Sequence, residues 1–397
     1  MERVPPQEIH RRLAAFQKDL ATHDLDGVLL FQNVDIFYFS GTIQSSILFI
    51  PTQGDPILMV QKGFQRVKEE SPLKNIIAVN GKSHLSNTLQ DFGVRGVKKL
   101  GLELDVLPAQ LYVWLAETFP QCRFVDVSVS IRRRRMVKSA YETDQIRKAA
   151  AILHQGYTEI QGFIKEGVSE LEIDGRLAFI ARREGHMGIL RMRGWNQEMT
   201  HAHVLSGDSG SVVSFLNSPH GGSGNTPAMA QGASFRRIRK NEPVGIDYGV
   251  GINGYLADQF RTFVIGDLPP QLAKAHQCSR EIHDLFAQEA KPGVPCAHLY
   301  AMAKEFASQA GLDDYFMGHG EGQVRFIGHG LGLEIDEFPL IAPNFEGALA
   351  QNMVIAYEPK FVFPGQGVVG MEDDYLVTPT GVERLTLTEQ ELIKLKP

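Results

Sequence analysis

The first third of the chain alternates segments of helical and strand periodicity. Leu13, Phe16 and Leu20 recur at helical spacing and predict a helix over Ile9–His23. Short apolar runs bounded by turn residues follow, and these predict strands. The predicted strands are Gly27–Phe31, Ser46–Ile50, Pro56–Val60, Lys98–Glu103 and Cys122–Val127, with a helix over Pro108–Thr118 between the last two. The pattern is α/β, and no glycine-rich phosphate loop follows any of these strands.

A change in pattern near residue 135 predicts a domain boundary. The arginine run Ile131–Met136 is typical of a solvated helix approach or the edge of a linker. Ser139 and Glu142 then have the spacing of a capping box, which predicts a long helix that reaches about Ile164. We therefore expect a smaller α/β domain over 1–135 and a larger α+β domain over 136–397.

The second part contains an internal echo. Gly167 and Gly185 flank one helix-like segment, and Gly293 and Gly311 flank another of the same length. Each segment leads into strand-rich sequence with embedded acids. Two amphipathic helices share a period by nature, so a chance match is the alternative. The echo favours a duplicated α+β half with a site between the halves.

The stretch 245–263 predicts a β-hairpin that carries two acids. Asn253-Gly254 between alternating apolar runs favours a type I′ turn. With that turn, Asp247 lies opposite Phe260, and Asp258 points to the same face as a diagonal neighbour at roughly 7–8 Å between Cα atoms. Arg261 should point to the other face. Two carboxylates on an apolar face need a cation, so a metal is indicated, unless the acids stand at strand ends in water.

Three further residues could complete a metal site. His329 stands between Gly328 and Gly330, which leave room for a ligand, Glu358 ends an apolar run, and Glu372 lies inside another. A lone histidine is more often structural, and a lone strand glutamate more often faces water. Taken together, four acids and one histidine suit Mn²⁺, Co²⁺, Fe²⁺ or Zn²⁺. Two such ions about 3.5–4 Å apart can bridge a hydroxide and polarise a carbonyl, which indicates hydrolysis.

Composition narrows the class of protein. A net charge of −6 and a pI near 6.1 argue against nucleic-acid binding. The N-terminus has no apolar core of a signal peptide, and no segment approaches about 18 uninterrupted apolar residues. Cys122, Cys278 and Cys296 are widely spaced and suggest buried thiols. We therefore expect a cytoplasmic protein that binds neither nucleic acid nor membrane.

These motifs together resemble the pita-bread metallopeptidases of family M24, the prolidase, Xaa-Pro aminopeptidase and creatinase group. The settings are "IDYG…LADQFRTF", "GHGLGLEIDEFP", "AYEP" and "MEDDYLVT", and residues 10–130 resemble the creatinase-like N-terminal domain of that group. The resemblance implies a dinuclear centre, manganese among the candidate ions, in a homodimeric enzyme that cleaves an amide, such as an Xaa-Pro peptide bond. It implies Asp247, Asp258, His329, Glu358 and Glu372 as metal ligands, with Glu358 also assisting proton transfer. His220 matches a substrate-side histidine that stabilises the tetrahedral intermediate.

The chain departs from the prolidase pattern at the substrate end. Asp336 stands where prolidases have a histidine, and Leu340 and Gly370 stand where they have arginines that hold a dipeptide carboxylate. A preference for free dipeptides is therefore not expected. His201, His203 and His319 are interpreted as exposed loop histidines that could reach the pocket. A creatinase-like enzyme acting on a non-peptide C–N bond, or a non-catalytic binding relative, are the alternatives to a peptidase.

Overall fold

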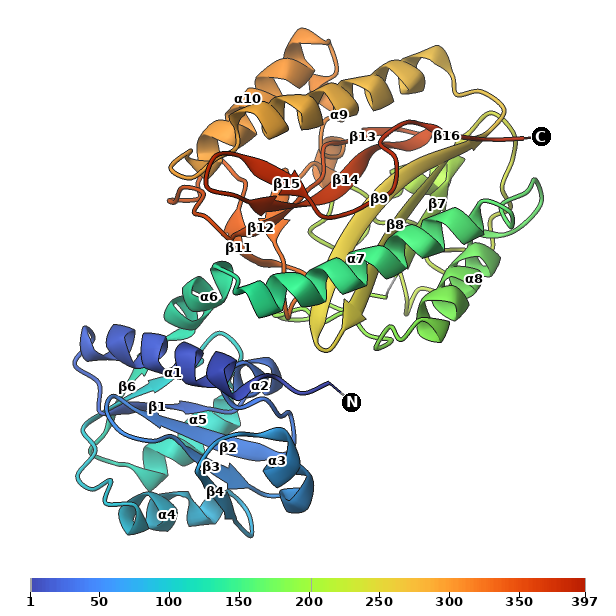
Figure 1. Ribbon diagram of the computed structural model, residues 1–397. Helices are drawn as coiled ribbons and strands as arrows, with labels where there is room; N and C mark the ends of the chain where they lie inside the picture. The colour runs from blue at the N-terminus through green and yellow to red at the C-terminus, as the bar shows by residue number, and fades with distance from the viewer. Residues whose placement is uncertain (1, 201, 397) are drawn as a thin grey trace. The chain divides into compact units, whose positions relative to one another are not determined.

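The computed structural model describes residues 2–200 and 202–396. These residues form two compact units, and the division between the units falls between Arg134 and Arg135. Each unit is built on its own sheet with helices packed against it (Figure 1). The helix α6 (Ser128–Met136) contains the boundary between the units.

The first unit has a mixed sheet in the order β4-β3-β2-β1-β5-β6. Its strands are β1 (Gly27–Leu30), β2 (Ser46–Pro51), β3 (Ile57–Val60), β4 (Asn75–Ala78), β5 (Lys99–Leu102) and β6 (Arg123–Asp126). Its helices are α1 (Pro6–Ala21), α2 (Asn33–Ser40), α3 (Phe64–Glu70), η1 (Lys82–His84), α4 (Leu85–Asp91) and α5 (Ala109–Thr118). The five predicted strands and two predicted helices of this part are confirmed. The predictions missed β4 and the helices α2, α3 and α4.

Helix α1 shows how the sequence periodicity becomes packing. Leu13, Phe16 and Leu20 are buried along one face of the helix. This is the apolar stripe that predicted the helix. On the sheet, Leu29, Phe49 and other apolar side chains form a continuous buried cluster.

The second unit has a largely antiparallel sheet in the order β11-β10-β12-β14-β9-β8-β7. Its strands are β7 (Ala202–Ser206), β8 (Pro243–Ile252), β9 (Tyr255–Ile265), β10 (Gly328–Gly330), β11 (Glu337–Leu340), β12 (Val354–Tyr357), β13 (Lys360–Phe363), β14 (Gly367–Val377), β15 (Val382–Arg384) and β16 (Ile393–Leu395). Strands β13 and β15 pair with β14, and β16 pairs with β9. The long strands β8, β9 and β14 therefore form the centre on which the other strands are arranged.

The helices of this unit form two pairs. They are α7 (Ala140–Ile160), α8 (Glu170–Arg183), α9 (Pro270–Glu289) and α10 (Cys296–Gln309), with short η2 (Gly207–Ser211), η3 (Asp313–Tyr315) and η4 (Gly320–Gly322). The capping box predicted at Ser139 and Glu142 is present at the start of α7. Helices α7 and α8 pack on β7, β8 and β9, whereas α9 packs on β13 and β14 and against α10.

The internal echo of the sequence corresponds to a structural repeat. Helices α8 and α10 are each 14 residues long. Gly167, Gly185, Gly293 and Gly311 all have positive φ angles, from +72° to +104°, which glycine adopts without strain. Each helix is therefore flanked by two such glycines, although α8 begins with a capping box at Ser169 and α10 follows Pro295 without one. Each helix belongs to a different helix pair.

The interpretation of the arginine run as solvated is wrong for Arg135. Its guanidinium is buried and lies 2.7 Å from Glu334 and 2.5 Å from Glu337. Lys138 adds a second buried cation 2.9 Å from Glu337. Burial alone would raise the pKa of Glu337, but these two cations lower it to about 2. The end of the run is thus part of the core, a fact that local composition does not reveal.

Candidate metal centre

The predicted hairpin brings acids to one face of the central sheet. Strands β8 and β9 pair without a bulge, with Asp247 opposite Phe260 and a turn at Asn253-Gly254, as predicted. Phe260 in turn lies opposite Glu372 on β14. Directly opposed residues point to the same face of a sheet, and so do residues two apart along a strand. Asp247, Asp258 and Glu372 therefore share one face.

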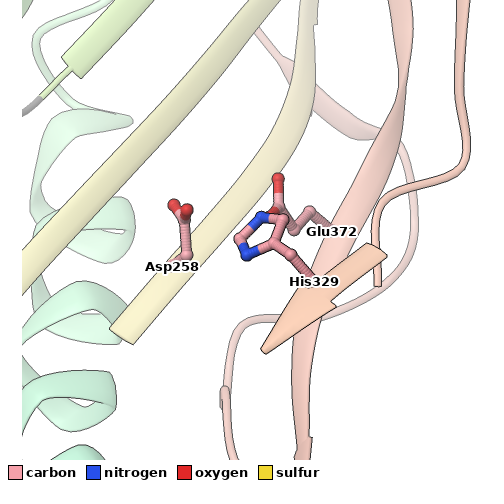
Figure 2. Close-up of side chains that lie close together, drawn as sticks. All are labelled: Asp258, His329 and Glu372. Carbon is pink, nitrogen blue, oxygen red and sulfur yellow. The ribbon is translucent and has the colours of Figure 1, made fainter. Parts of the chain in front are cut away.

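Three of the predicted ligands lie close enough to hold one ion. Asp258, His329 and Glu372 each offer a ligand atom, and these atoms lie within 4.8 Å of one another (Figure 2). All three side chains are buried. His329 Nδ1 lies 3.1 Å from the carbonyl oxygen of Gly330, to which it can only donate. Its Nε2 is then the atom available to a metal.

The remaining two predicted ligands lie on the same face. Glu358 follows β12, and its Oε1 lies 3.7 Å from His329 Nε2, close to the 3.8 Å from that atom to Glu372 Oε1. Asp247 retains some exposure, 14% of its side chain, and contributes to the wall of a pocket. The structure thus gathers all five residues, although neither Asp247 nor Glu358 is part of the closest group, Asp258, His329 and Glu372.

The glycines beside His329 serve the sheet as well as the site. A Cβ at Gly328 would lie 2.6 Å from the carbonyl oxygen of Ala356 on the neighbouring strand β12. A Cβ at Gly330 would meet the backbone of Phe338. The sequence interpretation of these glycines as room for a ligand is therefore incomplete, because they are needed for close approach of strands.

A buried lysine in the acid cluster was missed by the sequence interpretation. Lys360, the first residue of β13, is 1% exposed. Its Nζ donates to Asp247 Oδ2 at 3.0 Å, Glu358 Oε2 at 2.8 Å and Glu372 Oε2 at 2.6 Å. The only signal in the sequence is a charged residue at the start of the apolar run 360–363, directly after Glu358-Pro359.

Electrostatics divides the cluster into two sides. Burial would raise the pKa of Asp247, but the Lys360 ammonium and His220 hold it well below its usual range. Burial raises the pKa of Glu372 to about 8, and burial together with neighbouring acids raises that of Asp258 well above its usual range. Negative charge is therefore compensated beside Lys360 and in excess beside Asp258. A divalent cation beside Asp258, His329 and Glu372 would remove that excess, so these residues fit a metal ion.

Two histidines, His203 and His220, are neighbours of Asp247. His203 on β7 is opposite Asp247 in the sheet register, and its ring meets that of His220 edge to face at 5.7 Å. His203 is buried and hydrogen-bonds with Gln231, so its interpretation as an exposed loop residue is wrong. The sequence interpretation placed it in a polar loop, whereas residues 202–206 form the buried strand β7 that pairs with β8. His220 Nε2 lies 3.0 Å from Asp247 Oδ2, and its side chain has no exposed surface.

The other two loop histidines differ. His319 is half-buried, with Nε2 3.1 Å from the carbonyl oxygen of Ser211. His201 lies outside the described residues. Of the two that the structure describes, His203 is the one that contacts a residue of the predicted site.

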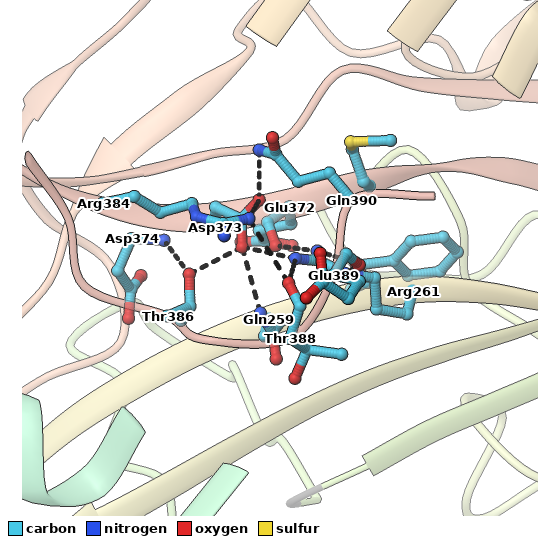
Figure 3. Close-up of polar contacts among 12 residues, drawn as sticks. Gln259, Arg261, Glu372, Asp373, Asp374, Arg384, Thr386, Thr388, Glu389 and Gln390 are labelled. Atoms are coloured by element: carbon cyan, nitrogen blue, oxygen red, sulfur yellow. Dashed lines mark hydrogen bonds and ion pairs between the residues drawn. The ribbon is translucent and has the colours of Figure 1, made fainter. Parts of the chain in front are cut away.

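Arg261 lies on the opposite face of the sheet, as predicted, and there it forms a buried ion pair that the sequence did not predict. Arg261 and Asp373 are both fully buried and lie 2.6 Å apart. Arg261 also donates to the carbonyl oxygens of Glu372, Thr388 and Glu389, and Thr386 and Gln390 donate to Asp373 (Figure 3). Charge-assisted hydrogen bonds on the face opposite the acid cluster thereby fix the strand that carries Glu372.

A pocket opens onto the acid cluster. Beside the five predicted ligands its lining comprises Met192, Gln197, Met199, Leu216, Asn217, Ser218, Phe326, Ile335 and Asp336. The described lining includes Asp336 but neither Leu340 nor Gly370. No lysine or arginine is among the described residues that line it.

Gly370 has a structural reason to lack a side chain. It is the cross-strand partner of Lys360 and has a φ of +149°. A Cβ there would lie 2.6 Å from the carbonyl oxygen of Pro359 and 2.9 Å from Lys360 Cα. An arginine at 370 is therefore incompatible with this backbone.

Among the described residues, no helix has the length and apolar character needed to cross a membrane.

Comparisons with known proteins agree with this geometry. The Xaa-Pro dipeptidase of Pyrococcus furiosus is 27% identical over 96% of this chain and 99% of its own. The crystal structure of the prolidase from Pyrococcus horikoshii OT3 superposes with a TM-score of 0.81 at 26% identity, covering 96% of this chain and 100% of that one. The Xaa-Pro dipeptidase from Bacillus anthracis has a TM-score of 0.84 at 24% identity, covering 98% and 100%, and shows the fold alone.

Two family matches cover most of the chain. Residues 12–137 match the Creatinase/Prolidase N-terminal domain, and residues 144–379 match Metallopeptidase family M24. The predicted fold, a pita-bread catalytic domain preceded by a creatinase-like domain, is confirmed. Such membership implies divalent metal ions, which the acid and histidine cluster is suited to bind. The chain belongs to metallopeptidase family M24 and is a metallopeptidase-type hydrolase.

Proposed function

We propose that this protein hydrolyses the amide bond of Xaa-Pro peptides. The observation that carries the proposal is a pocket with acids and a histidine at one end and a group of apolar side chains in its wall. The apolar side chains are Met192, Met199, Leu216, Phe326 and Ile335, beside the polar Gln197, Asn217 and Ser218. Apolar side chains of this kind suit the pyrrolidine ring of proline, and the relative from Pyrococcus furiosus, named as an Xaa-Pro dipeptidase, supports the same substrate class.

Divalent ions belong to the proposal, with manganese, cobalt, zinc and iron as the candidates. The sequence predicts a pair of ions held by Asp247, Asp258, His329, Glu358 and Glu372, and the gathering of these five residues on one sheet face supports a metal site there. A bound ion would polarise the scissile carbonyl as a Lewis acid.

Protein groups would handle protons and position the substrate. Glu358 reaches the pocket and lies beside both His329 and Lys360, so it is the proposed carrier of the proton that moves to the leaving amine. His220 contacts Asp247, and its role toward the substrate stays a prediction. Asp336 lies at the pocket, and its Oδ1 is 3.6 Å from His329 Nδ1.

The substrate end favours neutral or cationic groups. Prolidases are expected to hold a free carboxylate with arginines at positions that are Leu340 and Gly370 here. Each charged hydrogen bond contributes about 1.5–3 kcal/mol. Two missing bonds would thus weaken binding of a free dipeptide by roughly 10²–10⁴-fold, and Asp336 would repel the same carboxylate.

The test is kcat/KM on metal-loaded protein for an Xaa-Pro dipeptide, its C-terminal amide and a longer Xaa-Pro peptide. We expect the amide and the longer peptide to exceed the free dipeptide. A preference for the free dipeptide would refute the substrate-end proposal. Small non-peptide amides belong in the same screen, because a pocket without cations also suits a neutral substrate of the creatinase type. Hydrolysis of none of these would leave a binding relative.

We further propose a cytoplasmic homodimer. The free thiols of Cys122, Cys278 and Cys296 suit a reducing compartment. The dimer rests on the family resemblance. Light scattering of the purified protein would test it, with a monomeric mass as the contrary result.

A further inference from the structure

The ammonium of Lys360 is placed as a resident cation of the acid cluster. Its three hydrogen-bond donors match three carboxylate acceptors, from Asp247, Glu358 and Glu372, at 2.6–3.0 Å. An ammonium with all donors satisfied and 1% exposure is a fixed group. It also lies 4.9 Å from the centre of the Phe260 ring, which adds a cation–π contact.

The position of Lys360 is set by the backbone. Its amide nitrogen and carbonyl oxygen both contact Met317, and its strand pairs with β14 directly at Gly370. Gly370 leaves the space that the close approach of the two strands needs. The lysine therefore enters the cluster from a paired strand.

The oxygen atoms of the cluster divide between two places. Oε2 of Glu358 and Oε2 of Glu372 face Lys360, whereas Oε1 of each faces His329 at 3.7 and 3.8 Å. Asp247 contacts Lys360, whereas Asp258 lies in the group beside His329. None of the ion pairs of the described residues includes Asp258.

A second metal ion would need the oxygens that Lys360 holds. Metal–carboxylate distances are about 2.0–2.2 Å, so an ion shared by those three oxygens would coincide with the ammonium nitrogen. We propose that the Lys360 ammonium replaces one of the two metal ions, so that the chain binds a single divalent ion at Asp258, His329 and Glu372. The inference rests on the proposed function only in treating the cluster as a metal site.

The first experiment counts ions on the full chain. Protein stripped with a chelator is titrated with Mn²⁺ and, separately, Zn²⁺ by calorimetry, and retained metal is measured after gel filtration. We expect one ion per chain at saturation. Two ions per chain, or none, would overturn the proposal.

A matched pair of variants tests which acid is a ligand. Asp247→Asn and Asp258→Asn make the same chemical change on adjacent strands. If Lys360 occupies the position of the second metal ion, Asp247→Asn should still bind one ion, with an affinity within about tenfold of wild type. Asp258→Asn weakens binding at least about 100-fold. Loss of the ion from both variants, or from Asp247→Asn alone, contradicts the proposal.

Removing the Lys360 ammonium should allow a second metal ion to bind. Lys360→Ala is expected to bind two ions per chain, whereas Lys360→Met, which fills the space without charge, is expected to bind one. Lys138→Ala is the control, because it removes another buried ammonium, 2.9 Å from Glu337, away from the cluster. Its count should stay at one. A folded Lys360→Ala that binds only one ion would show that the lysine does not limit the count, and if this variant does not fold, the aspartate pair decides.

The metal count and the substrate screen fail independently. One ion per chain with no hydrolysis of Xaa-Pro peptides would refute the proposed substrate and leave this inference standing. Two ions per chain with full hydrolysis would refute the inference alone.

Discussion

The ion pair behind the site offers a stability test with a built-in control. Arg261 and Asp373 are fully buried, and the guanidinium also donates to the main-chain oxygens of Phe260 and Glu372. Arg261→Met keeps the bulk of the side chain but removes these donors. It leaves the Asp373 carboxylate in the interior without its principal cation.

The expected loss is large because the remaining charge cannot reach water. Breaking a buried ion pair by removing one partner costs about 3–5 kcal/mol of unfolding free energy. A change of 1 kcal/mol shifts the melting temperature of a domain of this size by about 2–4 °C, so we expect Tm to fall by roughly 6–20 °C. Exposed pairs contribute only about 0–1 kcal/mol, so Arg147→Met serves as the control. Arg147 bonds Glu383 on β15, with side chains 42% and 48% exposed.

The assay is thermal unfolding followed by circular dichroism on chelator-treated protein, because bound metal would shift Tm by itself. Arg147→Met should lie within about 2–4 °C of wild type. The double variant Arg261→Met/Asp373→Asn should recover part of the loss, because it removes the stranded charge. The reasoning is refuted if Arg261→Met melts within the range of Arg147→Met, or if the double variant is less stable than the single one.

Three further predictions concern metal, catalysis and pH. Glu372→Ala should lose bound metal, measured by elemental analysis, and unchanged metal content would remove Glu372 from the site. His220→Ala should lower kcat by about 10²–10³-fold while metal content stays the same, and parallel loss of both would make it a ligand. Burial raises the pKa of the Asp174 carboxyl from 3.8 to about 6. The folded protein therefore binds this proton more tightly than the unfolded chain does, and the free energy of unfolding falls as pH rises from 3.8 to about 6. In urea unfolding, Asp174→Asn should be more stable than wild type by about 1–3 kcal/mol at pH 8 and equal to it below about pH 4, and a difference independent of pH would exclude this cause.

Local patterns predicted the parts of the site that depend on register. The Asn253-Gly254 turn fixes the pairing of β8 with β9, and from that pairing follow the shared face of Asp247 and Asp258 and the opposite face of Arg261. These conclusions need only the period of a strand and the geometry of a turn. The amino-acid sequence alone is therefore sufficient to reach them.

Long-range packing does not follow from local patterns in the same way. His203 and Arg135 both lie in segments whose composition indicates exposure, and both are buried by elements distant in sequence. Arg135 meets Glu334 and Glu337, about 200 residues away along the chain. Burial of a charged residue depends on a partner that a local window does not contain.

Lys360 and Gly370 show how two apparent departures become one feature. From the sequence, Gly370 is a missing arginine and Lys360 is an isolated charge in an apolar strand. In the sheet they are directly paired, and the absent side chain at 370 allows the backbone of Lys360 to lie where its ammonium reaches three carboxylates. A positive charge is thus removed from the substrate end of the pattern and another is present among the acids. Both observations support the two proposals made above, a substrate without a free carboxylate and a centre with a single metal ion.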